Sequence, residues 1–335
     1  MLGGLRKRTV ISLEPIIGQS HAVRLLTRML ENDRLPHALL FTGIDGIGKQ
    51  TAAKALAMAL NCLRSAGVLA CMECRCCKKV ISGNHPDIII VEPSSRFIKI
   101  GQIRALRKHL SFAPVEGGRR VIIINDAHCM NVEASNAILK ILEEPPDNTH
   151  VVLTAHQTSD LLPTIVSRCQ HIAFNPVPVA KIVEELANRR DVDEDTATTI
   201  AVLAKGSLGR AMSADIEKWM GWRKELLGRV ISLSGGSMHT LFGFAEEVSK
   251  DKDKLQDTLD MFIMWFRDIL ICKFHPEKIL NNDYAPRIER ISKEFSVDEL
   301  LNRITAIFAT QRAVLKNANR RLALEVLLLN LYLSS

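Results

Sequence analysis

A glycine-rich segment that ends in lysine is the first group of residues that could do chemistry. The segment GIDGIGK follows an apolar run and opens a helical pattern, and it holds Gly43, Gly46, Gly48 and Lys49. Glycines let backbone amides turn toward phosphate oxygens, and a lysine at the start of the helix reaches the outer phosphates. The segment therefore predicts a phosphate-binding loop. The alternative is a glycine-rich turn that holds no ligand.

The positions that would bind magnesium beside this loop are altered. Gln50 stands where a serine or threonine hydroxyl normally ligates the ion, and the hydroxyl of Thr51 lies about 100° away around the helix. Asn125 and Asp126 follow a second apolar run, where one acid should bind magnesium and a glutamate should orient the attacking water. Asn125 is a neutral amide, and the side chain of Asp126 is one bond shorter than that of a glutamate. We therefore expect poor or absent ATP hydrolysis and no magnesium, while the glycine loop leaves binding of ATP or ADP open.

Four cysteines have the spacing of a metal site. The pattern C-x8-C-x2-C-x2-C comprises Cys62, Cys71, Cys74 and Cys77, and it lets four thiolates converge on one tetrahedral zinc ion. Four sulfur ligands leave zinc no open position, so the predicted role is structural. Cys76 could replace Cys77 in the set, although its side chain should point away. Buried or unpaired thiols are the alternative to zinc.

These groups need a scaffold of alternating strands and helices. Four short apolar runs predict strands buried on both faces, at His37 to Phe41, Asp87 to Val91, Val121 to Ile124 and Val151 to Leu153. Helical patterns between them, such as 49–60 and 132–142, predict an α/β fold with a parallel sheet and helices on both faces. Ligands collect where the strands of such a sheet end.

The strand signal stops after Pro176 and Pro178. Apolar residues then recur at helical spacing, as at Leu255, Leu259 and Phe262, and a nearly all-apolar helix over 322–333 closes the chain. Such a helix must be buried in its own domain or against another subunit. The predicted domains are a nucleotide-binding domain over 1–176 with a zinc-binding insertion at 62–77, a small helical domain over 177–218, and a helical domain over 219–335 that begins between Ser213 and Gly221.

The composition is weaker evidence than the motifs about the partners and the compartment of this protein. The chain has 335 residues, 44 of them basic and 37 acidic, with a formal charge of +7. This excess fits a partner that carries phosphates, but many enzymes share it. Arg6, Lys7 and Arg8 are not followed by the apolar stretch of a secretory signal, and no apolar run approaches a membrane span. We expect a cytosolic protein whose cysteines are metal ligands or core residues rather than disulfides.

Several segments together resemble one known family. They are Ile17-Gly18-Gln19, the phosphate loop, the cysteine module, the run from Asn136 to Pro146, Ser167-Arg168-Cys169, and the C-terminal stretch with Asn317 and Asn319. Over essentially the whole chain they resemble the clamp-loader subunits of bacterial DNA polymerase III, which are AAA+ proteins. The altered phosphate loop, Asn125-Asp126 in place of Asp-Glu, and His85-Pro86-Asp87 resemble the delta-prime branch rather than the ATPase gamma/tau branch.

The resemblance implies an AAA+ module, a small helical lid and a helical collar that joins subunits. It also implies an assembly of delta, delta-prime and gamma/tau chains that loads the sliding clamp onto primed DNA in the cytoplasmic replisome. In that assembly this chain would be a non-catalytic or weakly catalytic subunit of the DNA polymerase. The segment Gly206 to Arg210 resembles the second sensor loop of the family, with its arginine one position later.

Arg168 is the residue that the resemblance assigns to the ATP site of a neighbour. In the family, the arginine of the Ser-Arg-Cys motif enters the site of the adjacent subunit, and Ser167 and Cys169 keep both flanking positions as interface candidates. Pro163 begins a short helix where no donor is lost, and this helix can present Arg168 outward at its far end. We expect Arg168 to act in trans as an arginine finger. A solvated or structural arginine is the alternative.

Two glutamates end the helical pattern over 132–142. Carboxylates are electrostatically disfavoured at the C-terminus of a helix. Glu143 and Glu144 are therefore predicted to serve an interface or a ligand rather than to be tolerated surface charge.

Three other functions stay open at this point. An ATP-hydrolysing gamma/tau subunit would need the magnesium chemistry that Gln50 and Asn125 oppose. A zinc-dependent nucleic-acid-binding protein would use the cysteine module, but Met72, Glu73 and Arg75 offer no aromatic ring for base stacking. A stand-alone AAA+ motor for branch migration is opposed by the same altered site.

Overall fold

The computed structural model describes residues 16–64, 70–116, 118–233 and 237–332. Contacts divide the chain into two compact units. The first unit runs to Lys181 and takes in Gly206–Arg210, and the second comprises Ile182–Lys205 and the residues from Ala211 onward. The division into three domains stays a prediction.

The first unit is built on a five-stranded sheet in the order β2-β3-β4-β1-β5, with every pairing parallel. The strands are β1 (Ala38–Thr42), β2 (Ile88–Val91), β3 (Arg120–Ile124), β4 (Thr149–Ala155) and β5 (Gln170–Ala173). Because β3, β4 and β1 are neighbours and parallel, the loops that follow them meet at one edge of the sheet. This edge is where an open α/β sheet binds its ligands.

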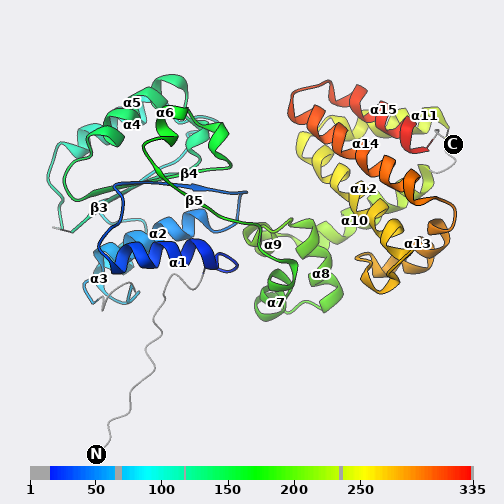
Figure 1. Cartoon of the computed structure of the whole chain (residues 1–335), viewed down its shortest axis with the longest axis horizontal. Helices are drawn as coiled ribbons and strands as arrows, with labels where there is room; N and C mark the ends of the chain where they lie inside the picture. Colours follow the sequence, from blue (N-terminus) through cyan, green and yellow to red (C-terminus); the bar gives the residue numbers. More distant parts are fainter. Residues whose placement is uncertain (1–15, 65–69, 117, 234–236, 333–335) are drawn as a thin grey trace, which may run out of the picture. The chain divides into compact units, whose positions relative to one another are not determined.

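Helices cover both faces of this sheet, as Figure 1 shows. They are α1 (Ser20–Glu31), α2 (Lys49–Asn61) and α3 (Arg75–Ile81) on one side, and α4 (Ile100–Leu110), α5 (Val132–Glu143) and α6 (Pro163–Val166) on the other. Alternate strand residues such as Leu40, Ile122 and Leu153 join the core that contains Ile103 of α4 and Ile138 of α5. The predicted α/β fold class is confirmed.

Two details of the sheet differ from the prediction. The strand β5 was not predicted, because its residues are exposed except for Ile172 and it carries little apolar signal. In β2 the side chains of Ile89 and Ile90 are only partly buried. The expectation of burial on both faces is therefore wrong for β2, because this strand lies at the edge of the sheet.

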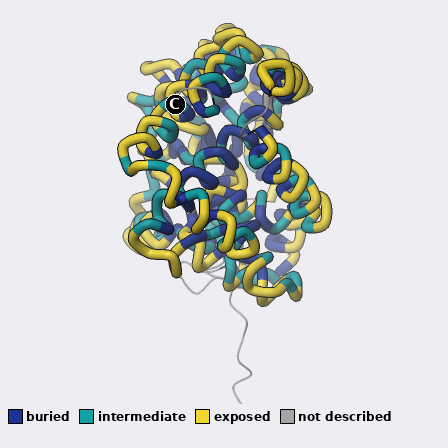
Figure 2. Tube along the Cα trace, turned by 90° about the vertical axis from the view of Figure 1, so that its right-hand side faces the viewer, coloured by how far each residue is buried: buried dark blue, intermediate teal, exposed yellow. Residues whose placement is uncertain are grey.

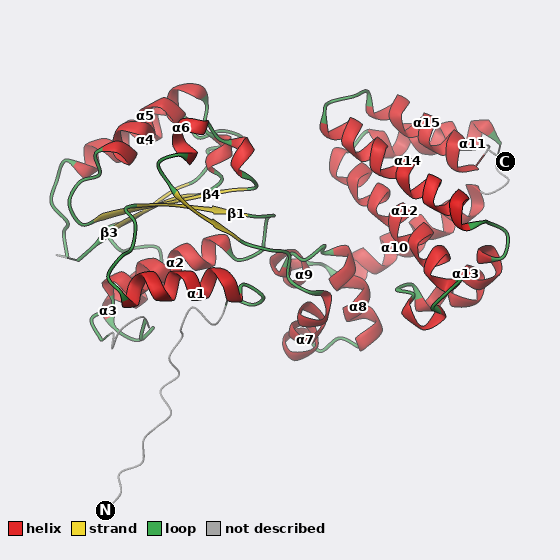
Figure 3. Cartoon of the chain, in the orientation of Figure 1, coloured by secondary structure: helices red, strands yellow, loops and turns green. Residues whose placement is uncertain are grey.

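From α7 onward the described residues form helices and contain no strand, as Figure 3 shows. The helices are α7 (Val179–Arg190), α8 (Glu194–Leu203), α9 (Leu208–Ser213), α10 (Ile216–Leu233), α11 (Met238–Ser249), α12 (Lys252–Cys272), α13 (Ala285–Ser292), α14 (Val297–Leu315) and α15 (Arg320–Tyr332). In the second unit α12 packs on α13 and α14, and α11 packs on α15. The helix α10 begins at Ile216, and where the last domain begins stays a prediction.

Buried and exposed stretches alternate along the tube in Figure 2, but in the long helix α12 no residue from Leu255 to Cys272 is exposed. Leu255, Leu259 and Phe262 are fully buried, as their spacing predicted. The closing helix α15 buries Leu324, Leu327, Leu328 and Leu331 in its own unit. Leu322 and Val326 on the same helix are exposed, so its burial is one-sided.

The structure bears on one of the two expectations about targeting. Arg6, Lys7 and Arg8 lie outside the described residues. Within the described part of the chain, no helix combines the length and the apolar character needed to span a membrane.

Candidate functional site

The predicted phosphate loop connects β1 to α2 and is held against the edge of the sheet. The amide of Gly43 donates to the carbonyls of Ala155 at 3.2 Å and of His156 at 2.9 Å, at the end of β4. Gly46 and Gly48 have φ of +69° and +104°, which glycine adopts without steric cost. The loop thus has the strand, turn and helix that a phosphate site requires.

Lys49 points back into this loop. The residue is 6% exposed, and its ammonium donates to the carbonyls of Gly43 at 2.5 Å and Ile44 at 3.0 Å and lies 3.4 Å from Oδ1 of Asp45. Burial lowers the pKa of Lys49, and the carboxylates of Asp45 and Asp126 oppose that shift. The loop's own oxygens therefore satisfy the lysine that would otherwise face a phosphate.

The two residues that stand at magnesium-ligating positions of the motif are hydrogen-bonded to one carboxylate. The side-chain amides of Gln50 and Asn125 donate to the same carboxylate oxygen of Glu92, at 3.2 Å and 2.9 Å. Asn125 is buried, and its Oδ1 has no hydrogen-bond partner among the described residues. The hydroxyl-bearing Thr51 is exposed. Two neutral amides and one carboxylate give magnesium few of the anionic oxygens that it prefers.

Glu92 was missed by the sequence reasoning. It is the first residue after β2, and an acidic residue at the carboxyl end of a strand is the signal that could have found it.

Asp126 follows β3 in a left-handed backbone conformation, with φ of 50°. Its amide donates to Oγ1 of Thr154 at 3.0 Å. Ligand atoms of Asp126, His128 and His156 lie within 4.8 Å of one another. Burial and the neighbouring His156 lower the pKa of His128. Neither histidine was predicted as a site residue. The two lie close together because β3 and β4 are neighbouring strands.

The segment that resembles a second sensor loop packs directly on the phosphate loop. The amide of Gly209 donates to the carbonyl of Gly46 at 2.7 Å. A Cβ atom on Gly46 would lie 2.4 Å from Oγ of Ser207, and one on Gly209 would lie 2.9 Å from Cα of Gly46. The two backbones are therefore in close contact, which only glycine permits at both positions.

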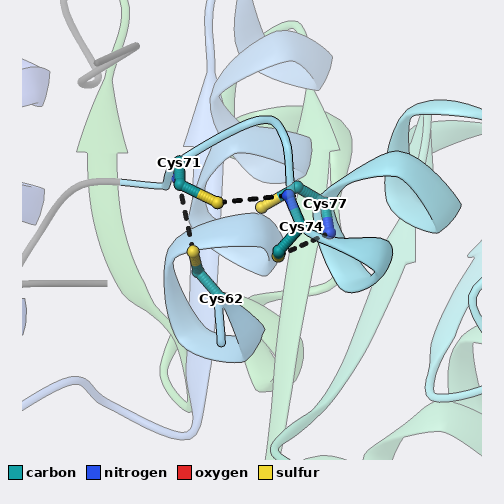
Figure 4. A group of neighbouring side chains, drawn as sticks. All are labelled: Cys62, Cys71, Cys74 and Cys77. Atoms are coloured by element: carbon teal, nitrogen blue, oxygen red, sulfur yellow. Dashed lines mark hydrogen bonds between the residues drawn. The ribbon is translucent and has the colours of Figure 1, made fainter. Parts of the chain in front are cut away.

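The four predicted zinc ligands converge, as Figure 4 shows. Their sulfur atoms all lie within 4.8 Å of one another, and they come from Cys62 at the end of α2, Cys71, Cys74 at the start of α3, and Cys77. Backbone amides point at three of the sulfurs: Cys71 N lies 3.2 Å from Cys62 Sγ, Cys74 N lies 3.3 Å from Cys71 Sγ, and Cys77 N lies 3.4 Å from Cys74 Sγ. Amides that donate to sulfur favour the thiolate, which is the form that binds metal.

Burial and hydrogen bonding shift the pKa values of two of these thiols in opposite directions. Burial raises the pKa of Cys74, but hydrogen bonds from the amide of Cys77 and from neighbouring groups outweigh it and bring the pKa to about 6. Burial and the bonds to Cys74 and Cys62 raise the pKa of Cys77. One thiol of the cluster thus ionises readily, and the cluster fits the chemistry of a metal ion that replaces the remaining protons.

Cys76 belongs to a different group. Its sulfur lies 2.9 Å from Nε2 of His85, while Nδ1 of His85 accepts from the amide of Asp87 at 3.2 Å. Nε2 of His85 therefore carries the proton and donates to sulfur. The carboxylate of Asp87 accepts from the amides of Val115 at 2.7 Å and Glu116 at 2.8 Å. His85-Pro86-Asp87 thus anchors the loop before β3 and holds Cys76 away from the four-cysteine cluster.

Arg168 lies just beyond α6, which begins with Pro163 as predicted. The guanidinium donates to the carbonyl of Thr164 at 2.9 Å and pairs with Oε1 of Glu143 at 2.7 Å. The side chains of Arg168 and Glu143 are 36% and 45% exposed. The structure therefore brings together the predicted arginine and one of the two predicted glutamates from separate helices.

The remaining interface candidates are the sequence neighbours of this pair. Ser167 donates through Oγ to the carbonyl of Thr164 at 3.2 Å. Glu144 is exposed at the end of α5. Burial raises the pKa of Cys169 to about 11, so Cys169 is a neutral thiol, and it packs against the apolar core of the first unit.

The sheet order β2-β3-β4-β1-β5, the phosphate loop after β1 and the helical C-terminal region define an AAA+ module followed by a helical domain. The family model described as "DNA polymerase III, delta subunit" matches residues 18–178, and the one described as "DNA polymerase III, delta subunit, C terminal" matches 217–332. The delta-prime subunit of Bacillus subtilis is 31% identical over 317 residues, which are 93% of this chain and 96% of that protein. The chain therefore belongs to the delta-prime family of bacterial DNA polymerase III subunits.

Other relatives match shorter shares of their own length. The delta-prime subunit of Pseudomonas aeruginosa is 38% identical over 56% of this chain and 58% of that protein. The tau subunit of Bacillus subtilis is 30% identical over 87% of this chain and 54% of that protein. A gamma subunit-related structure from Thermotoga maritima aligns at a TM-score of 0.38 and 19% identity, over 93% of this chain and 98% of that one. Because that score is low, the assignment rests on the sequence relatives and the family models.

Proposed function

We propose that this chain works with delta and gamma/tau subunits in a clamp loader that places the sliding clamp on primed DNA in the cytoplasmic replisome. The delta-prime relative aligns along 93% of this chain, and gamma and tau subunits are further relatives, which supports a place in the same assembly. The clamp and DNA are reached through the assembled complex.

Arg168 is the residue that acts on the neighbouring subunit, with Ser167, Cys169 and Glu144 at the contact. The observation that carries this proposal is the pairing of its half-exposed guanidinium with Glu143 of the same chain. Such an exposed pair contributes about 0.2–1 kcal/mol, so the charged phosphates of an adjacent ATP site can compete for the arginine. A guanidinium set against a transferring phosphoryl group raises the rate by about three to five orders of magnitude.

The chain's own nucleotide pocket does not hydrolyse ATP. Gln50 and Asn125 are engaged with Glu92, and Lys49 is engaged with its own loop. Magnesium is thus not bound, and ATP or ADP would first have to draw Lys49 away from those carbonyls. Hydrolysis of ATP depends mainly on the electrostatic help that magnesium and the lysine give.

An ATPase assay tests whether this chain stimulates the ATPase of its partners without hydrolysing ATP itself. The chain alone should show no hydrolysis above background, and its addition to gamma/tau, delta, clamp and primed DNA should stimulate hydrolysis. If the purified chain hydrolyses ATP by itself, the proposal is wrong and an active motor of the gamma/tau kind takes its place.

The cluster of Cys62, Cys71, Cys74 and Cys77 holds one structural zinc ion. The converging sulfurs and the amides that point at them support this role. A zinc ion held by four sulfurs has no open position for a substrate, so it would hold the end of α2 to the start of α3.

The ion pair with Glu143 competes with the phosphates of the neighbouring ATP site for Arg168. This competition gives a second prediction. Glu143→Gln keeps the size of the side chain but removes the charge that competes with the phosphates for Arg168. We expect half-maximal stimulation of the partner ATPase at a concentration of this chain up to about fivefold lower, in line with the worth of an exposed ion pair. The measurement is a titration of gamma/tau ATPase with each variant.

Glu133→Gln is the matched control, because Glu133 is an exposed glutamate of the same helix α5 that lies outside the proposed contact. It should titrate like the unchanged chain. A loss of stimulation in Glu143→Gln would contradict the role of a competitor, since it would mean that Glu143 positions the arginine in the active assembly.

A further inference from the structure

Another group of metal-ligating side chains lies at the edge of the sheet, apart from the cysteine cluster and from the group of Cys76, His85 and Glu116. Asp126 and His128 follow β3, and His156 follows the neighbouring strand β4. One ligand atom from each residue lies within 4.8 Å of the other two. The parallel pairing of β3 and β4 therefore brings together a carboxylate and two imidazoles from segments far apart in the sequence.

One ring nitrogen of His128 lacks a hydrogen-bond partner in the described part of the chain. Its Nδ1 is buried, and within the described residues it has no hydrogen-bond partner. The ring centroids of His128 and His156 are 4.3 Å apart. A buried polar atom without a partner costs free energy, and a bound cation is one way to recover it.

The phosphate loop adds a fourth residue to the group. Oδ2 of Asp45 lies 3.1 Å from Nε2 of His156. A carboxylate that accepts from a histidine ring fixes the tautomer and the orientation of that ring, and histidines that bind metals commonly have such a partner. Asp45 thus supplies an outer contact that the three residues alone would lack.

We propose that Asp126, His128 and His156 bind one divalent transition-metal ion of the zinc type, with Asp45 as the hydrogen-bond partner of His156. Imidazole nitrogens favour zinc, cobalt or nickel over magnesium. Three protein ligands leave one position for water. Such an ion would tie the phosphate loop to the ends of β3 and β4, in the pocket that has lost its magnesium ligands. This site is independent of the arginine and of the four-cysteine cluster.

Metal content measured on the full chain tests the proposal. The chain and its His156→Gln variant are stripped of metal, equilibrated with the same low micromolar concentration of Zn²⁺, and analysed for bound zinc. The unchanged chain should retain one more equivalent of zinc than His156→Gln. The side chain of His156 is 46% exposed, so this substitution should leave the fold intact.

His275→Gln is the matched control. His275 is also an exposed histidine with a carboxylate partner, Glu277 at 3.2 Å, and this variant should bind as much zinc as the unchanged chain. Asp126→Asn provides a second test and should lose the same equivalent as His156→Gln.

Cobalt separates this site from the cysteine cluster. When the chains are loaded with Co²⁺, the sulfur-to-cobalt absorption that reports the cysteines should persist in His156→Gln while one equivalent of cobalt is lost. Equal metal content in the unchanged chain and in His156→Gln would overturn the proposal. If none of the proteins shows the sulfur-to-cobalt absorption, the structural zinc site is wrong. The difference in metal content between the unchanged chain and His156→Gln still decides the present proposal.

Discussion

Replacing Arg168 with alanine is expected to slow hydrolysis at the neighbouring ATP site by about a thousandfold or more. The variant loses the guanidinium that would stabilise the charge on the transferring phosphoryl group. It also loses the pair with Glu143, which is exposed and contributes little to folding. Single-turnover ATPase of the complete assembly with clamp and primed DNA measures the effect, as the appearance of a slow phase for the affected site.

Arg119→Ala is a closely matched control for this prediction. The side chain of Arg119 is also 36% exposed, and its guanidinium also lies 2.7 Å from a carboxylate, that of Asp33. This variant should stimulate hydrolysis like the unchanged chain. Assembly of both variants is checked by gel filtration. If Arg168→Ala assembles and supports the full rate, Arg168 is a structural residue and the arginine finger must be abandoned.

Loss of the metal at the cysteine cluster is expected to cost much of the stability of the first unit. A ligand present at about a thousand times its Kd stabilises the folded state by roughly 4 kcal/mol. For a unit of this size that corresponds to a fall of about 10 °C in Tm. Cys71→Ser should therefore lose one zinc and melt about 10 °C lower, as measured by metal analysis and thermal unfolding. A chelator should lower the Tm of the unchanged chain to a similar extent.

Cys76→Ser tests the identity of the ligands in the same module. The sulfur of Cys76 faces His85, so this variant should keep its zinc, whereas Cys77→Ser should lose it. The reverse outcome would mean that Cys76 replaces Cys77 in the set. Full zinc content in Cys71→Ser would refute the four-cysteine site.

The sequence by itself determined the features that depend on residues close together in the chain. These features are the glycine loop before Lys49, the cysteine module and the start of α6 at Pro163. Each depends on the conformations of a few consecutive residues. Apolar runs alternating with helical patterns were also sufficient for the fold class, since buried parallel strands carry a strong apolar signal. The strand β5 lacked that signal because three of its four residues are exposed.

Only the tertiary structure decided which distant side chains meet. Glu92 reaches Asn125 because β2 lies beside β3, and His156 reaches Asp126 because β4 lies on the other side of β3. Glu143 meets Arg168 because α5 and α6 pack on the same face of the sheet. The order of strands is set by burial of the whole core rather than by any local pattern. A single sequence therefore predicts the strands and their ends, but not the side chains that face one another across them.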